Sequence, residues 1–163
     1  FVVIEGEPGI GKTRLAEEVG REATRRGALV LWGRTLEGGA SPAFWPWLPP
    51  LRALANALPP TSTLAPELAT LLSPTRASDD APGAAEAARY VLAERIVALI
   101  AQHASQRQIV LVLDDLQWAD TTSLELLSFL AGRLNAGLLV VATVRRLEVG
   151  RSDALVDLSL IHI

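Results

Sequence analysis

A short glycine-rich segment constrains this chain more than any other part of its sequence. Residues 6–13 read GEPGIGKT, which matches the pattern G-x-x-x-x-G-K-[ST]. The segment follows an apolar run at 1–5, typical of a buried strand, and it precedes a stretch at 12–26 with helical periodicity. A glycine-rich turn between a buried strand and an amphipathic helix predicts a loop that binds phosphate groups.

The residue types in this loop suit a nucleoside triphosphate. Glycine lets the backbone approach phosphate oxygens closely, while the amide groups and the helix N-terminus direct positive dipoles at them. Lys12, the single lysine among 15 lysine and arginine residues, would reach the β- and γ-phosphates, and the hydroxyl of Thr13 would bind magnesium. We therefore predict ATP or ADP, with Mg²⁺, as cofactors. The predicted nucleotide-binding residues are Gly6, Glu7, Pro8, Gly9, Ile10, Gly11, Lys12, Thr13 and Arg14.

A second strand pattern ends in two carboxylates. Residues 109–113 read IVLVL and are followed directly by Asp114 and Asp115. Because phosphates bind at the edge where parallel strands end, these carboxylates would face the loop. We predict that Asp114 holds the magnesium ion together with Thr13, directly or through water. Asp115 would orient or deprotonate an attacking water, which makes it a candidate catalytic residue. Lys12, which would reach the β- and γ-phosphates, is a second candidate.

The strand pattern at 138–144 also ends in polar and basic residues. Thr143 lies at its end, and Arg145 and Arg146 follow. A polar residue and an arginine here would sense the γ-phosphate if this strand lies beside the strands that carry the loop and the acidic pair. We favour Arg145 as the sensor, and as a third catalytic residue, because it lies nearer the strand end. The alternative is that both arginines are solvated loop charges.

Strand and helix patterns alternate along the chain. The strands are apolar enough to be buried on both faces, which is typical of a parallel sheet covered by helices. We predict an α/β fold of the P-loop NTPase type, with a central parallel sheet in a three-layer α/β/α arrangement. The expected strands are 1–5, 28–32, 109–113 and 138–144; the expected helices are 12–26, 47–58, 64–72, 84–106 and 122–135, with a loop at 73–83.

Three local features are interpreted as structural. The residues TSLE at 122–125 fit a capping box that begins the following helix, and Asp120 is a second candidate cap. The aromatic cluster at 44–47 is expected to anchor a loop and a helix onto the core. His103 lies on an apolar helix stripe, where a structural role is expected.

Composition excludes several classes of function. A net charge of −3 argues against nucleic-acid binding by a basic patch of this segment. The absence of cysteine and the presence of only two histidines exclude a disulfide framework and a zinc site. No apolar run is long enough to span a membrane, and no signal-peptide pattern is present. We therefore expect a cytoplasmic protein without a membrane partner.

The two ends of the sequence are unusual. The chain begins inside an apolar run and contains no methionine, so we interpret it as a piece of a longer protein. Its last six residues, LSLIHI, are those that a transposon-end sequencing adapter would encode. We predict an ATPase domain at 1–157 and a translated adapter tail at 158–163. The alternative for 158–163 is an ordinary apolar strand.

Four segments carry a resemblance to a known family. They read VIEGEPGIGKTRL, LWGRTLEGGASPAFWPWLPPLRAL, IVLVLDDLQWAD and LVVATVR. Together they resemble the ATPase module of large bacterial LuxR-type transcriptional regulators. These proteins belong to the STAND class of multidomain signal-transduction ATPases, which are related to AAA+ proteins.

The resemblance implies a regulatory switch. In this family an ADP-bound form is off, an ATP-bound form self-associates and is on, and slow hydrolysis resets the module. The family roles carry over to Lys12, Thr13, Asp114, Asp115 and Arg145. The resemblance also implies that a fifth strand, a helical lid and any DNA-binding domain lie beyond Asp157. We expect the segment without them to bind ATP weakly.

Other functions remain open from the sequence. The same module occurs beside nucleotide-cyclase and protein-kinase domains, so the output is not fixed. A P-loop enzyme of another class, such as a small-molecule kinase, is the main alternative. The tandem Asp114–Asp115 suits a hydrolytic water better than a substrate hydroxyl, and residues 38–82 contain no charged substrate clamp. A GTPase is disfavoured because no N-K-x-D motif is present.

Overall fold

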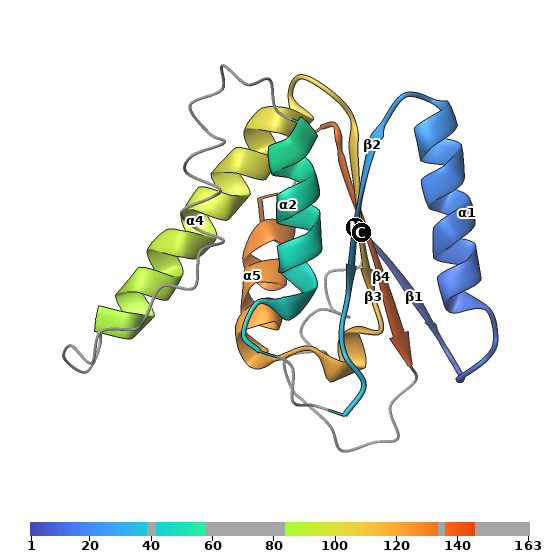
Figure 1. Ribbon diagram of the computed structural model, residues 1–163, viewed down its shortest axis with the longest axis horizontal. Coiled ribbons are helices and arrows are strands. Elements are labelled where there is room, and N and C mark those ends of the chain that lie inside the picture. The colour runs from blue at the N-terminus through green and yellow to red at the C-terminus, as the bar shows by residue number, and fades with distance from the viewer. Residues whose placement is uncertain (39–41, 58–83, 134–135, 146–163) are drawn as a thin grey trace.

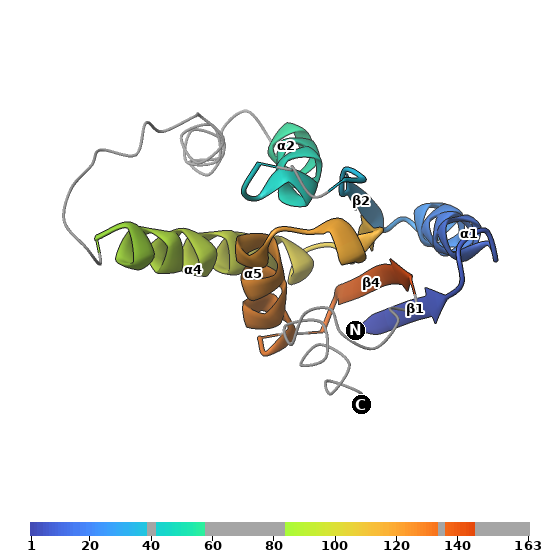
Figure 2. The same ribbon diagram turned by 90° about the horizontal axis from the view of Figure 1, so that it is seen from below.

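A computed structural model describes residues 1–38, 42–57, 84–133 and 136–145. Within these ranges, four parallel strands form one sheet in the order β1-β4-β3-β2 (Figure 1). Helix α1 covers one face of the sheet, and α2, α4 and α5 cover the other (Figure 2). This confirms the predicted three-layer α/β/α fold. The elements are β1 (Val2–Gly6), α1 (Lys12–Arg25), β2 (Leu29–Arg34), η1 (Trp45–Trp47), α2 (Leu48–Ala57), α4 (Ala84–Ala104), β3 (Ile109–Asp114), η2 (Leu116–Trp118), α5 (Thr121–Ala131) and β4 (Leu138–Arg145).

Strand register aligns the polar ends of the strands at one edge of the sheet. Gly6 at the end of β1 pairs with Arg145 at the end of β4. Arg34 at the end of β2 pairs with Asp114 at the end of β3. Strand β3 lies between β2 and β4, and all of its residues are buried. The carboxyl edge therefore gathers residues that are far apart in the sequence.

The two faces of β3 bury alternate side chains in two cores. Leu111 and Leu113 pack into the larger core, which α2, α4 and α5 complete. Val110 and Val112 pack into a smaller core, which Ala16 of α1 completes. This alternation is the period of two that a strand imposes, and it explains why an unbroken apolar run is needed when both faces are covered.

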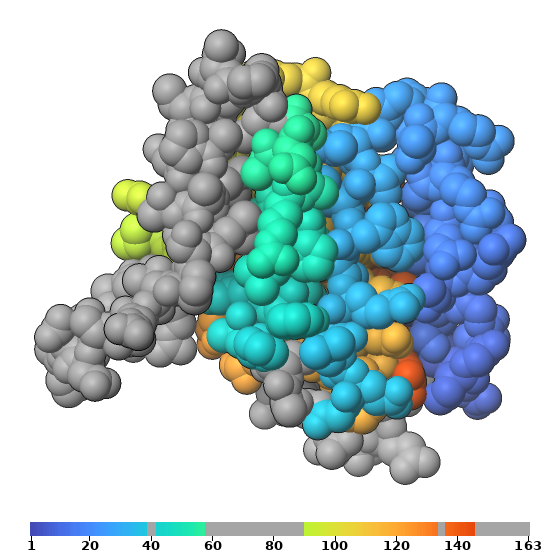
Figure 3. Space-filling view, viewed as in Figure 1, coloured from blue at the N-terminus to red at the C-terminus, as the bar shows by residue number. Residues whose placement is uncertain are grey.

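The connection after β2 lies directly against the strand. A Cβ at Gly33 would collide with the backbone oxygen of Pro46, so only glycine allows this approach. Trp47 is fully buried, and its Nε1 donates to the backbone oxygen of Ser123 at 3.1 Å. The aromatic cluster therefore anchors α2 onto the core, as predicted. At the surface, the residues of β2 are visible between α2 and α1 (Figure 3).

Two expectations about local structure are corrected. Helix α5 is capped by Asp120, whose Oδ1 accepts the Ser123 N–H at 3.0 Å, and not by a capping box beginning at Thr122. The cap lies two residues earlier because Asp120 has extended backbone geometry while Thr121 is already helical. Strand β2 ends at Arg34, two residues beyond the predicted 28–32. The predicted helix 64–72, the loop 73–83 and the tail 158–163 lie outside the described residues.

His103 has the structural role that its position indicates. Its Nδ1 lies 2.8 Å from the backbone oxygen of Leu99, one turn earlier in α4. Ile96 and Leu99 on the same helix are buried in the larger core. The predicted apolar stripe of this helix is therefore confirmed over its C-terminal half.

Candidate nucleotide-binding site

The predicted phosphate loop connects β1 to α1 at the carboxyl edge of the sheet. Gly9 and Gly11 have φ values of 80° and 100°, a region that side-chain-bearing residues rarely adopt. The exposed residues 7–11 form the loop, and α1 begins at Lys12 immediately after it. The first amide groups of α1 are therefore directed at this edge, where an anion would be stabilised.

Lys12 lies back against the loop. Its Nζ donates to the backbone oxygens of Gly6 and Glu7 at 3.0 and 2.8 Å, and the residue is only 7% exposed. An ammonium group has three N–H donors. Two of them are used within the described part of the chain, which leaves one for a phosphate oxygen.

Asp114 is the centre of the site. The residue is fully buried, and its Oδ1 accepts the hydroxyls of Thr13 at 3.0 Å and Thr143 at 2.5 Å. Its Oδ2 accepts Nε and Nη2 of Arg34 at 2.9 and 2.6 Å. The phosphate loop and three strand ends thus meet at one carboxylate.

The chemistry of these residues fits magnesium. Mg²⁺ is usually held by one or two carboxylates together with phosphate oxygens and water. The Thr13 hydroxyl donates its proton to Asp114, so its lone pairs remain available to a metal ion. No cluster of three or more histidine, aspartate or glutamate residues occurs in the described ranges, so a metal cage made only of protein is not indicated there.

Asp115 has a different environment from its neighbour. Its backbone is left-handed, with φ 60° and ψ 40°, and this turns the chain out of β3 into η2. The Asp115 N–H donates to the Thr143 hydroxyl at 2.9 Å, and its carbonyl accepts the Thr35 hydroxyl at 2.5 Å. Its carboxylate accepts Gln117 Nε2 at 3.1 Å. A side chain that is 27% exposed, against 0% for Asp114, can reach a water molecule.

Arg145 lies beside the phosphate loop, as expected for the end of a strand next to β1. Its Nη1 is 3.3 Å from Glu37 Oε1, and its Nε is 3.7 Å from Asp115 Oδ1. Its backbone N–H donates to Gln117 Oε1 at 3.0 Å. Gln117 therefore connects Asp115 to the end of β4. The alternative sensor Arg146 lies outside the described residues.

Sequence reasoning missed four residues of this site. Arg34 is the last residue of β2, Thr35 and Glu37 follow it, and Gln117 follows the acidic pair. Polar residues at the carboxyl ends of parallel strands converge, and we applied this rule to the other strands. The same rule could have identified Arg34. The predicted strand stopped too early for that rule to be applied. Arg14, predicted in the loop, is exposed and pairs with Glu17 and Glu18 on α1.

Comparison with known proteins agrees with this geometry. A family model described as AAA ATPase domain matches residues 1–141. The chain belongs to the AAA ATPase domain family. It is an AAA+ P-loop ATPase module, and members of this family bind nucleotides. No curated protein matches the chain.

A solved structure is similar over most of the chain. It is a structure of C. elegans PCH-2, with 14% sequence identity and a TM-score of 0.42. The match covers 96% of this chain and 32% of that one, so the chain spans about a third of its length. In the part of the AAA ATPase module that the structure describes, no helix is long and apolar enough to cross a membrane.

Proposed function

We propose that this module binds ATP and hydrolyses it slowly, as the regulatory ATPase of a multidomain signalling or transcription regulator. One observation carries the proposal. Thr13 Oγ1 lies 3.0 Å from Asp114 Oδ1, although the two residues are 101 positions apart in the sequence. A P-loop hydroxyl beside a buried strand-end carboxylate is the arrangement that holds magnesium in nucleoside triphosphatases.

Each residue of the site has a role in this proposal. Lys12 and the amide groups after Gly6 bind the β- and γ-phosphates. Thr13 and Asp114 hold magnesium, which when bound neutralises phosphate charge and orients the γ-phosphate. Asp115 accepts a proton from the attacking water or orients it, because its carboxylate is the exposed member of the pair.

Arg145 supports the assignment of a switch. Its guanidinium faces both Asp115 and Glu37. A γ-phosphate would attract this guanidinium away from the two carboxylates, so the environment of Asp115 would differ between ATP and ADP. We propose that this difference drives self-association of the ATP-bound form. DNA contacts, in this proposal, belong to another domain of a cytoplasmic regulator.

Phosphate release from ATP, measured without any acceptor substrate, tests the function. Wild-type protein should turn ATP over, and Asp115→Asn should reduce turnover about 100-fold because a proton acceptor is lost. Binding of a fluorescent ATP analogue should survive in Asp115→Asn and be lost in Lys12→Ala. Arg25→Gln, on the exposed surface of α1, is the matched control and should behave as wild type.

Two results would count against the proposal. Phosphate transfer that requires a second substrate would identify the module as a kinase. Equal turnover by wild type, Asp115→Asn and Lys12→Ala would show that the activity does not come from this site.

A further inference from the structure

Arg34 is a charged partner of Asp114 that the proposed chemistry does not use. It is the last residue of β2 and pairs in register with Asp114. Its Nε and Nη2 lie 2.9 and 2.6 Å from Asp114 Oδ2. Two nitrogens of one guanidinium therefore bind the same oxygen of the carboxylate proposed to hold magnesium.

Asp114 already accepts as many hydrogen bonds as a carboxylate can. A carboxylate has about four lone-pair sites. Thr13 and Thr143 occupy Oδ1, and the two Arg34 nitrogens occupy Oδ2, where Thr13 also lies within 3.2 Å. A cation that binds Asp114, directly or through a water molecule, must displace one of these donors.

Arg34 is the donor that leaves most easily. Its side chain is 61% exposed, so its guanidinium can turn into solvent without unpacking the core. Thr143 is fully buried in the sheet, and Thr13 is fixed in the first turn of α1. Departure of Arg34 would leave a buried carboxylate without a counter-charge unless another cation takes its place. Two cations bound to this carboxylate would repel each other.

We propose that Arg34 and magnesium exclude each other at Asp114, so that Arg34 sets the Mg²⁺ concentration at which nucleotide binds tightly. The inference rests on the proposed function, because it requires a magnesium–nucleotide complex as the ligand. Arg34 neutralises Asp114 until the ion and the phosphates arrive together. It is then a residue that determines the metal dependence of binding, and it is not a catalytic residue.

The test compares the affinity for a fluorescent ADP analogue in EDTA with that in Mg²⁺. The dissociation constant in EDTA divided by that in Mg²⁺ measures how much magnesium strengthens nucleotide binding. Arg34→Gln should raise this ratio about tenfold, because one charge-assisted interaction no longer competes with the ion. Arg34→Gln also removes positive charge near the phosphates, and this weakens binding of the metal-free nucleotide more than binding of its less negative magnesium complex. A variant that keeps the charge is therefore needed to separate the two effects. Arg34→Lys keeps the charge without the two-nitrogen fork and should give an intermediate ratio.

A second measurement needs no nucleotide. In EDTA, Arg34→Gln should unfold at a lower temperature than wild type, because buried Asp114 has lost its counter-charge. Mg²⁺ alone should then raise the unfolding temperature of Arg34→Gln more than that of wild type. The matched control is Arg25→Gln, which removes an exposed arginine paired with Glu22 and should change neither measurement.

The outcomes separate this inference from the proposed function. If wild type binds nucleotide and Arg34→Gln has an equal or smaller ratio, the inference is wrong and the function stands. If wild type binds nucleotide no better than Lys12→Ala in either buffer, both are wrong. If Arg34→Gln does not fold, the ratio for Arg34→Lys decides, and a value equal to wild type overturns the inference.

Discussion

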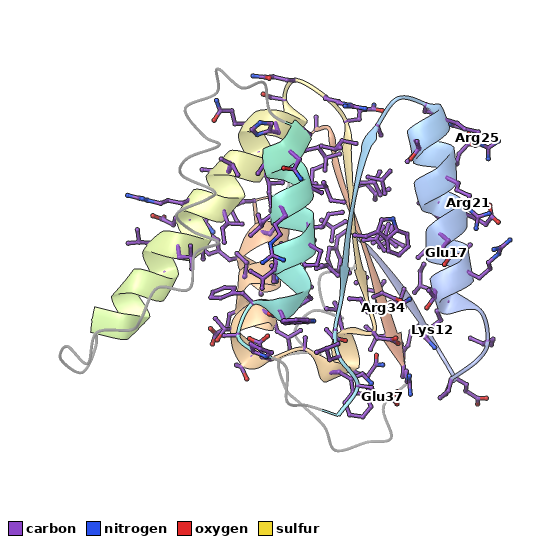
Figure 4. All side chains as sticks on the ribbon, in the orientation of Figure 1. Lys12, Glu17, Arg21, Arg25, Arg34 and Glu37 are labelled. Carbon is purple, nitrogen blue, oxygen red and sulfur yellow. The ribbon has the colours of Figure 1, made fainter. Side chains whose placement is uncertain are left out.

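Arginine–carboxylate pairs occur in two very different regions of this molecule. Along α1, Arg14 and Arg21 bracket Glu17 and Glu18 at 3.1 to 3.6 Å, with side chains 44 to 68% exposed. At the carboxyl edge of the sheet, Arg34 lies 2.6 Å from Asp114, which is fully buried. Figure 4 shows Glu17, Arg21 and Arg25 along α1, and Lys12, Arg34 and Glu37 toward the end of the sheet.

The two kinds of pair contribute differently to the stability of the fold. Pairs along α1 join residues three or four positions apart, are screened by solvent and add at most a few tenths of a kcal/mol each. The Arg34–Asp114 pair joins residues 80 positions apart and satisfies a carboxylate that cannot reach water. The same two ion types therefore solubilise a helix in one region and hold strand ends together in the other.

The largest expected difference is between Asp114→Ala and Glu17→Ala. Removing Asp114 leaves the buried Thr143 hydroxyl without its acceptor and should lower the free energy of unfolding by about 3 kcal/mol. Glu17→Ala should change it by less than about 0.5 kcal/mol. Urea unfolding of both variants measures these free energies. Equal losses would show that the buried and the exposed carboxylate contribute equally to stability.

A matched pair of threonines sharpens the comparison. Thr143→Val removes the donor to Asp114 Oδ1 and the acceptor of the Asp115 N–H, and should cost about 2 kcal/mol. Thr24→Val on α1 removes only a bond to the Gly20 backbone oxygen and should cost less than about 0.5 kcal/mol. Thermal unfolding of the two variants provides the measurement. A larger loss for Thr24→Val would contradict the expectation.

Glu37→Gln tests whether solvent exposure or a place at the site decides how much an ion pair contributes to the free energy of unfolding. Glu37 is at the site edge beside Arg145, but its side chain is 70% exposed. We expect the free energy of unfolding to change by less than about 0.5 kcal/mol, as for the α1 pairs. A loss above 1 kcal/mol, measured by urea unfolding, would show that location matters more than exposure.

The smallest expected effect concerns Glu22 on α1. A hydrogen bond from Arg26, with the charges of Arg25 and Arg26, lowers the pKa of Glu22 below its ordinary value of 4.5. Its ionised form therefore contributes stability above the unfolded pKa, and this contribution is lost as pH falls through the folded pKa. Arg26→Gln should move the pKa of Glu22 upward in an NMR titration. An unchanged pKa would show that Arg26 does not bind Glu22 in solution.

The parts of the site that depend on local sequence were predicted, and those that depend on register were not. Lys12 and Thr13 follow from one eight-residue pattern, and Asp114 follows from an apolar run that ends in an acid. The meeting of Thr13 with Asp114 also follows, because parallel strands end at a common edge. Arg34 could not be placed without knowing that β2 continues to it and pairs there with β3.

Turn geometry accounts for the other differences. Asp115 leaves β3 in a left-handed conformation and leads into η2, which brings Gln117 back to Asp115 and Arg145. No hydrophobic periodicity indicates such a turn. Asp120 caps α5 in place of the predicted box because only the backbone shows which residue is the last extended one. The fold itself was predictable because four apolar runs alternate with helical patterns.

The contacts of Asp114 also bear on how the chain reaches its native state. Its partners Thr13, Arg34 and Thr143 lie 101, 80 and 29 positions away in the sequence. Contacts across such separations form only after long loops have closed, and this slows folding. A partly folded chain with β1 and α1 alone has the glycine loop but none of the partners that complete the site. Tight nucleotide binding would therefore report that the whole sheet has assembled, and it could serve as a selective assay for the fully folded chain.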